Sequence, residues 1–139
     1  MLEKVMVTGV TGYIGQHCGA ELLRQGYEVV GTIRSMEKAE AVREGIAKVA
    51  PIDNLTFIEA DLTSDEGWSE AMAGCKYVLH VASPFIIADP EDENEMISPA
   101  VDGTLRVLSA AKAVGVERTV VTSSPVSYTH LTLPTILRV

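Results

Sequence analysis

The feature that most constrains this chain is a run of closely spaced glycines near its start. Gly9, Gly12 and Gly15 follow an apolar stretch at residues 5–7 and precede a segment with helical spacing of apolar residues. In such a strand–turn–helix unit, the first glycine permits a tight turn and the second lets backbone N–H groups approach a pyrophosphate. The third removes a side chain where helix and sheet touch. Because the motif has its required context, it predicts a dinucleotide ligand.

The rest of the pattern predicts strands that alternate with helices. Apolar runs at residues 5–7, 29–33, 55–60, 77–81 and 119–122 predict five strands. Helical spacing predicts helices from the glycine turn to Gly26 and at residues 36–49, 65–72 and 96–114, and the acidic segment 88–95 predicts a solvated loop. We therefore predict an α/β fold: a Rossmann-type doubly wound parallel sheet of strand order 3-2-1-4-5, truncated after the fifth strand.

Length, charge and cysteine usage narrow the class of protein. A chain of 139 residues accommodates one domain, and a net charge of −8 without clustered basic residues argues against a nucleic-acid partner. No apolar stretch approaches the ~20 residues of a membrane span. Cys18 and Cys75 show no metal-ligand spacing, which favours two buried, reduced thiols. With no leader before the first strand, we expect a cytoplasmic protein without a membrane partner.

The carboxyl ends of the strands should share one edge, where the ligand binds. An acidic residue about 20 positions past the glycine turn would hold the adenosine ribose of NAD, but the second strand ends in Arg34. A guanidinium suits the 2′-phosphate of NADP, although Arg34 as a loop cap remains open. Lys38 either adds charge there or faces solvent. Asp61 either holds the adenine amino group, with Leu62 packing against the ring, or is only an N-cap or turn residue.

Two further strand ends carry small or hydroxylated residues. Ala82, Ser83 and Pro84 follow the fourth strand and would let the nicotinamide half pass close to the backbone. The fifth strand ends in Thr122, Ser123 and Ser124, whose hydroxyls either orient a substrate carbonyl or alcohol or serve only in a turn. His17 is interpreted as a helix-surface residue and His80 as a strand-end residue, with a catalytic role left open for either.

Together these segments resemble the extended short-chain dehydrogenase/reductases. The resemblance covers roughly residues 3 to 124, through VTGVTGYIG, TIR, ADL, HVASP, NEMISPAVDGT and VVTSS. It is greatest with the branch of dihydroflavonol reductases, cinnamoyl-CoA reductases and microbial aldehyde or methylglyoxal reductases. The resemblance implies NADP as cofactor and the interconversion of a small-molecule carbonyl and an alcohol.

The resemblance also implies roles for individual residues. The implied cofactor contacts are the glycine turn, the ends of the second and third strands, and the segments after the fourth and fifth: Thr8, Gly9, Thr11, Gly12, Tyr13, Ile14, Gly15, Arg34, Lys38, Asp61, Leu62, Ala82, Ser83, Pro84 and Thr122. Ser124 corresponds to the family's catalytic serine. The family's tyrosine, followed four positions later by lysine, is absent: Tyr128 is followed at that spacing by Thr132.

The character of the chain changes after Ser124. The segment VSYTHLTLPT resembles the translation of a transposase mosaic-end sequencing adapter. We therefore expect residues 1–124 to form a partial NAD(P)-binding Rossmann domain and residues 125–139 to be a non-native tail. The intact parent would be an NADP-dependent oxidoreductase, and this chain would be inactive. A nucleotide-sugar epimerase or dehydratase, or a non-catalytic NADP-binding regulatory protein, remains an alternative.

Overall fold

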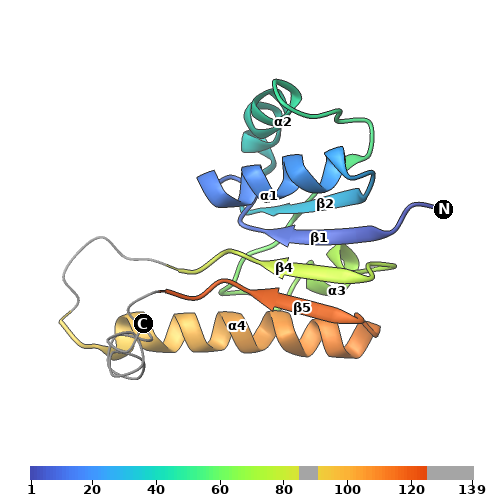
Figure 1. Cartoon of the computed structure of the whole chain (residues 1–139). Helices are drawn as coiled ribbons and strands as arrows, with labels where there is room; N and C mark the ends of the chain where they lie inside the picture. Colours follow the sequence, from blue (N-terminus) through green and yellow to red (C-terminus); the bar gives the residue numbers. More distant parts are fainter. Residues whose placement is uncertain (85–90, 125–139) are drawn as a thin grey trace, which may run out of the picture.

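The computed structural model describes residues 1–84 and 91–124, which form an α/β fold around one parallel sheet (Figure 1). Its strands are β1 (Lys4–Thr8), β2 (Glu28–Ile33), β3 (Leu55–Glu59), β4 (Tyr77–His80) and β5 (Arg118–Val121). All four neighbouring pairs are parallel, in the order β3-β2-β1-β4-β5. The predicted fold class and strand order are therefore confirmed. The predicted boundary after residue 124 falls where the described residues end, and the predicted tail, 125–139, lies outside them.

The helices lie where the apolar spacing predicts them, with different bounds. They are α1 (Tyr13–Arg24), η1 (Met36–Lys38), α2 (Ala39–Ala47), α3 (Trp68–Ala71) and α4 (Asn94–Val114). The helix predicted at 36–49 is thus a 3-10 turn followed by a shorter α-helix. Helix α4 begins inside the loop predicted at 88–95, with Glu93 as its N-cap, and Asp92 Oδ1 accepts a hydrogen bond from the Asn94 backbone N–H at 3.0 Å in the turn that leads into it. Residues 88–90 of that loop lie outside the described residues.

Apolar side chains pack on both faces of the sheet, because alternate residues of each strand point to opposite sides. Met6 and Val78 face α3 and α4, where they pack with Trp68, Met72 and Val107. The opposite face packs against α1 and α2 through a second cluster: Val7, Val10, Ala20, Leu23, Val29, Ile33, Val42, Ile46, Ala50 and Leu55. The core therefore lies around β1, β2 and β4, which explains why β1 has no polar alternation.

The edge formed by β5 is far less covered than the centre of the sheet. Val120 and Val121 are exposed, as are Val101 and Leu105 on α4. Figure 1 shows α4 running alongside β5, with the strand arrows all pointing to the same edge of the sheet. Among residues 1–84 and 91–124, no helix combines the length and apolar character needed to cross a bilayer.

Candidate functional site

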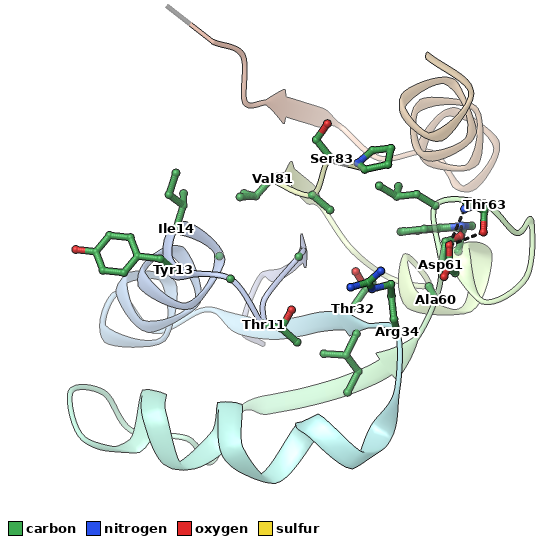
Figure 2. Close-up of a pocket in the computed structure, with 18 residues that line it drawn as sticks. Thr11, Tyr13, Ile14, Thr32, Arg34, Ala60, Asp61, Thr63, Val81 and Ser83 are labelled. Carbon is green, nitrogen blue, oxygen red and sulfur yellow. Dashed lines mark hydrogen bonds between the residues drawn. The ribbon is translucent and has the colours of Figure 1, made fainter. Parts of the chain in front are cut away.

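A pocket of about 580 Å³ opens at the carboxyl edge of the sheet, where β1, β2, β3 and β4 end (Figure 2). In this view Tyr13 and Ile14 lie at one end, Asp61 and Thr63 lie at the other, and Arg34 lies between them. The structure thus brings together residues from four separate turns: Gly9, Thr11, Gly12, Tyr13, Ile14, Gly15, Thr32, Ile33, Arg34, Ala60, Asp61, Leu62, Thr63, Trp68, Val81, Ala82, Ser83 and Pro84.

The glycine turn forms one wall of this pocket. Gly9 adopts a positive φ of 69°, and a Cβ there would lie 3.0 Å from Ala82 Cα, so the turn requires glycine at this position. The Gly12 N–H donates to the Gly9 carbonyl at 3.0 Å, and a Cβ on Gly12 would make only an ordinary contact, at 3.5 Å with that oxygen. The wall at Gly12 is therefore formed by bare backbone, as a pyrophosphate requires.

The amino end of α1 faces the pocket without a counter-charge. Gly12 is the N-cap, no side chain of the described residues caps the helix, and its first turn holds no acidic residue. The first backbone N–H groups of a helix have no partner within it, and the helix dipole makes that end partly positive. An anionic group of a ligand at Tyr13 and Ile14 would satisfy both properties.

Gly15 fills a somewhat different role from the one predicted. A Cβ at this position would lie 2.1 Å from the carbonyl oxygen of Gly9 and 2.9 Å from Val10 Cα. Gly15 therefore lets the helix pack against the turn that precedes it, whereas the motif predicted close packing against the sheet.

Arg34 follows the last residue of β2 and is exposed at the pocket. Among residues 1–84 and 91–124, no carboxylate forms an ion pair with its guanidinium. The segment after it is tied to β3, because the Met36 N–H donates to Glu59 Oε2 at 3.3 Å. The guanidinium is thus available to an anionic ligand, as a phosphate contact requires.

Asp61 lines the far end of the pocket and also builds the turn that follows β3. Its Oδ1 accepts hydrogen bonds from the Thr63 N–H at 2.8 Å and from Thr63 Oγ1 at 2.7 Å. The Thr63 bonds, with smaller contributions from Arg34 and Arg106, hold the pKa of Asp61 below its ordinary value. The carboxylate is therefore ionised at neutral pH, and the turn role left open by the sequence is present alongside its place in the pocket wall.

Trp68 lines the same end of the pocket and is bonded to the turn that carries Asp61. Its indole is buried, and Nε1 donates to the carbonyl oxygens of Ser64 at 2.9 Å and Asp61 at 3.2 Å. The turn carrying Asp61, Leu62 and Thr63 is thereby fixed to the core. This tryptophan lines the pocket, so its fluorescence can report on a ligand there.

Four predicted site residues lie outside the pocket wall. Thr8 is buried beneath it, and Thr122 donates from Oγ1 to the carbonyl oxygens of His80 and Val81 at 3.3 Å each. Lys38 ends η1, and Ser124 is exposed beyond the end of β5. Their assignments as cofactor or catalytic residues stay predictions. His17 lies exposed on α1 and His80 ends β4, as predicted.

Sequence reasoning missed six residues of the wall: Thr32, Ile33, Ala60, Thr63, Trp68 and Val81. Five of them lie within two positions of a predicted residue, so extending each strand end by a residue or two would have found them. Trp68 is different, because its position depends on how residues 61–67 turn. No spacing rule predicts that turn.

Neither cysteine lines this pocket. Burial raises the pKa of the Cys75 thiol to about 11, while Cys18 is only half-buried on α1. Cys75 is therefore buried as predicted and Cys18 is more accessible than predicted. Within residues 1–84 and 91–124, no group of three or more His, Cys, Asp or Glu side chains is placed to hold a metal ion.

Comparison with known proteins finds an oxidoreductase and a reductase among the relatives of this chain. The chain is 39% identical to an uncharacterized oxidoreductase of Schizosaccharomyces pombe over 125 residues, covering 86% of this chain and 36% of that protein. It is 38% identical to dihydroflavonol 4-reductase of Hordeum vulgare over 121 residues, covering 86% of this chain and 34% of the relative. The chain thus spans about a third of the length of these curated relatives.

A solved structure shares the fold and carries a cofactor. Yeast methylglyoxal/isovaleraldehyde reductase Gre2, solved in complex with NADPH, superposes with a TM-score of 0.75 at 33% identity, covering 87% of this chain and 37% of that one. The model of the NAD dependent epimerase/dehydratase family matches residues 5–134, which extends past the predicted boundary at residue 124. The matched span contains the whole pocket described above, and the chain belongs to the NAD dependent epimerase/dehydratase family.

Proposed function

We propose that this chain binds NADPH at the carboxyl-edge pocket and forms the cofactor-binding part of a reductase for small aldehydes or ketones. The observation that carries the proposal is Arg34: it directly follows β2 at the pocket, where an acidic residue would favour NAD, and no carboxylate of the described residues forms an ion pair with it.

The residues present fit the parts of this cofactor one by one. The backbone wall at Gly12 and the amino end of α1 suit the pyrophosphate, and Arg34 suits the 2′-phosphate. Asp61 keeps its Oδ1 in the turn, so Oδ2 remains for the adenine amino group, with Leu62 beside it. The small residues 82–84 suit the nicotinamide ribose, because they leave room near the backbone.

When bound, NADPH supplies the hydride that reduces a carbonyl carbon. The described residues of this chain would bind and orient it, and Ser124 would orient the substrate carbonyl. The sequence holds no tyrosine followed four positions later by lysine. We therefore expect this chain to bind NADPH without oxidising it.

The substrate class follows from the relatives. They include a dihydroflavonol 4-reductase and a methylglyoxal/isovaleraldehyde reductase, which favours a small carbonyl compound. A spectrophotometric assay with NADPH and either methylglyoxal or isovaleraldehyde should show no turnover by this chain. Cofactor oxidation above the blank would contradict the expected inactivity.

Calorimetric titration with NADPH and NADH tests the cofactor assignment. We expect Arg34→Ala to weaken NADPH binding by ten- to a hundredfold, roughly the effect of losing a charge-assisted hydrogen bond, and to leave NADH binding unchanged. Lys48→Ala removes one positive charge from an exposed position outside the pocket wall and serves as the matched control. Lys38→Ala, measured in parallel, decides whether η1 contributes to phosphate binding. An unchanged ratio of NADPH to NADH affinity in Arg34→Ala would refute the assignment.

The alternatives make different predictions. A nucleotide-sugar epimerase or dehydratase predicts preference for NADH, because Arg34 would then have no phosphate to bind. A non-catalytic NADP-binding regulatory protein would keep the dinucleotide pocket and lack the tyrosine and lysine pair, which does not occur within residues 1–139. It predicts the same NADPH preference as the reductase, and a longer sequence of the gene lacking a Tyr-x-x-x-Lys pair after residue 124 would support it.

A further inference from the structure

A buried hydrogen-bonded pair connects β1 to β4 directly beneath the pocket. Thr8 and His80 end neighbouring strands in register, and Thr8 Oγ1 lies 2.9 Å from His80 Nδ1. Both residues are almost wholly buried, at 0% and 2% exposure. The same Oγ1 accepts hydrogen bonds from the backbone N–H groups of Val81 and Ala82, each at 2.9 Å.

Counting the bonds of this hydroxyl fixes the protonation state of His80. A threonine hydroxyl has two acceptor lone pairs and one hydrogen to donate. Val81 and Ala82 occupy both lone pairs, so Thr8 must donate its hydrogen to His80 Nδ1. That nitrogen can accept only when it carries no proton. The geometry therefore requires the neutral imidazole of His80 with its proton on Nε2.

The surroundings of His80 favour the neutral ring. Burial lowers the pKa of His80 from its ordinary value of 6.5, and no charged group of the described residues contributes to that shift. The elements packed around β4 carry these charged side chains: Lys4 on β1, Arg118 on β5, Glu70 on α3, and Glu95, Asp102, Arg106 and Lys112 on α4. Lys4 and Arg118 are the first residues of their strands and therefore lie at the end of the sheet opposite to His80. Protonation of the buried ring would thus lack a compensating carboxylate.

This junction joins two walls of the pocket. Thr8 directly precedes Gly9, whose turn forms the first wall, while Val81 and Ala82 belong to the second. The two walls already touch closely, since a Cβ on Gly9 would lie 3.0 Å from Ala82. The Thr8 hydroxyl is the side-chain group that binds both backbone N–H groups of the second wall.

We propose that Thr8 and His80 are positioning residues that hold the glycine turn against the wall after β4, and that they do so only while the His80 imidazole is neutral. An imidazolium has no acceptor, so protonation removes the bond from Thr8 and leaves its hydroxyl facing a third donor. Affinity for the dinucleotide then falls as the pH falls. The effect on affinity rests on the proposed function, whereas the state of the pair does not.

Nitrogen-15 NMR of the His80 ring tests the pair without a cofactor. At pH 8 the ring nitrogens should show a protonated Nε2 and an unprotonated Nδ1. Thr8→Val keeps the shape but removes the hydroxyl, and should shift the amide signals of Val81 and Ala82, while Thr8→Ser should restore them. Thr56→Val removes an exposed hydroxyl on β3 and serves as the control. A proton on Nδ1, or unchanged amide signals in Thr8→Val, would overturn the proposal.

Titration with NADP⁺, followed by Trp68 fluorescence, tests the effect on binding. At pH 8 we expect Thr8→Val to weaken binding about tenfold and Thr8→Ser to stay close to wild type. His80→Asn supplies an acceptor that does not titrate, so its affinity should fall less below pH 6.5 than that of wild type. Because the phosphates of NADP⁺ titrate equally with both proteins, the difference isolates His80. Equal pH profiles would overturn the proposal that affinity depends on the neutral His80 imidazole. If the wild-type chain does not bind NADP⁺, the proposed function is refuted, and the NMR spectra of the ring still test the hydrogen bond between Thr8 and His80.

Discussion

Gly15 offers the sharpest test of the turn on which the pocket depends. Replacing it with alanine adds one methyl group inside α1, at a position where helix propensity alone favours alanine by about 1 kcal/mol. The structure predicts the opposite sign. The new Cβ would lie 2.1 Å from the Gly9 carbonyl oxygen, 2.7 Å from its carbon and 2.9 Å from Val10 Cα.

The size of the effect follows from what the methyl group meets. All three contacts are backbone atoms of the turn itself, so no side chain can rotate away, and the turn or the helix must shift by more than 1 Å, because the Cβ would lie 2.1 Å from an oxygen that it would ordinarily contact at 3.4 Å or more. Overpacking of a buried site costs about 1–3 kcal/mol, and a backbone clash belongs at the upper end. After the gain in propensity, we expect Gly15→Ala to lower the free energy of unfolding by about 2 kcal/mol or more.

Gly19→Ala is the matched control, one helical turn along the same element. A Cβ there would lie 3.6 Å from Ile46 Cδ1 and 3.6 Å from Val10 Cγ2, both ordinary contacts with side chains. This variant should be more stable than wild type by up to about 1 kcal/mol. Urea unfolding followed by the fluorescence of Trp68, the sole tryptophan, should therefore separate the two variants by about 3 kcal/mol. Equal midpoints for both variants would refute the reasoning about the turn.

Three further properties can be checked on the same protein. In the native chain a thiol reagent at pH 8 should modify Cys18 but not Cys75, because burial raises the pKa of Cys75 to about 11, and rapid loss of both thiols would contradict that burial. The neutral His80 contributes stability that is fully present above pH 6.5 and is lost as the pH falls towards its lowered pKa. His80→Asn should therefore lose less stability than wild type over that pH range. Parallel curves of unfolding free energy against pH for the two proteins would contradict the lowered pKa of His80. Gly26→Ala should destabilise by about 1 kcal/mol through its positive φ of 85° alone, since nothing lies within 4 Å of its Cβ, and no change in urea midpoint would show that the turn relaxes.

The sheet was predictable because its signals are local. Continuous apolar runs such as residues 5–7 read directly as strands buried on both faces, and the alternation with helices fixed their parallel pairing. The helix bounds were less predictable, because α4 begins at Asn94, two residues before the apolar pattern starts, after a turn in which Asp92 Oδ1 accepts a hydrogen bond from the Asn94 N–H. A turn of this kind rests on one side-chain contact and leaves no periodic signal.

The pocket residues that follow strand ends could be predicted from the sequence, whereas those placed by tertiary contacts could not. Arg34 and Asp61 lie where the carboxyl-edge rule predicts them. Trp68 is held at the pocket by packing in the core and by hydrogen bonds to its neighbouring turn. Thr8 was expected to contact the cofactor, yet its hydroxyl is fully engaged by residues of β4 and the turn after it, which the sequence separates from it by more than seventy positions.

The central claim is that a dinucleotide carrying a 2′-phosphate occupies the edge of this sheet, with that phosphate on Arg34. Parallel calorimetric titrations of the wild-type chain with NADPH and NADH at one salt concentration test it most directly. The account predicts saturable binding of both, with NADPH about tenfold or more the tighter ligand. Equal affinities, or no heat with NADPH, would contradict it.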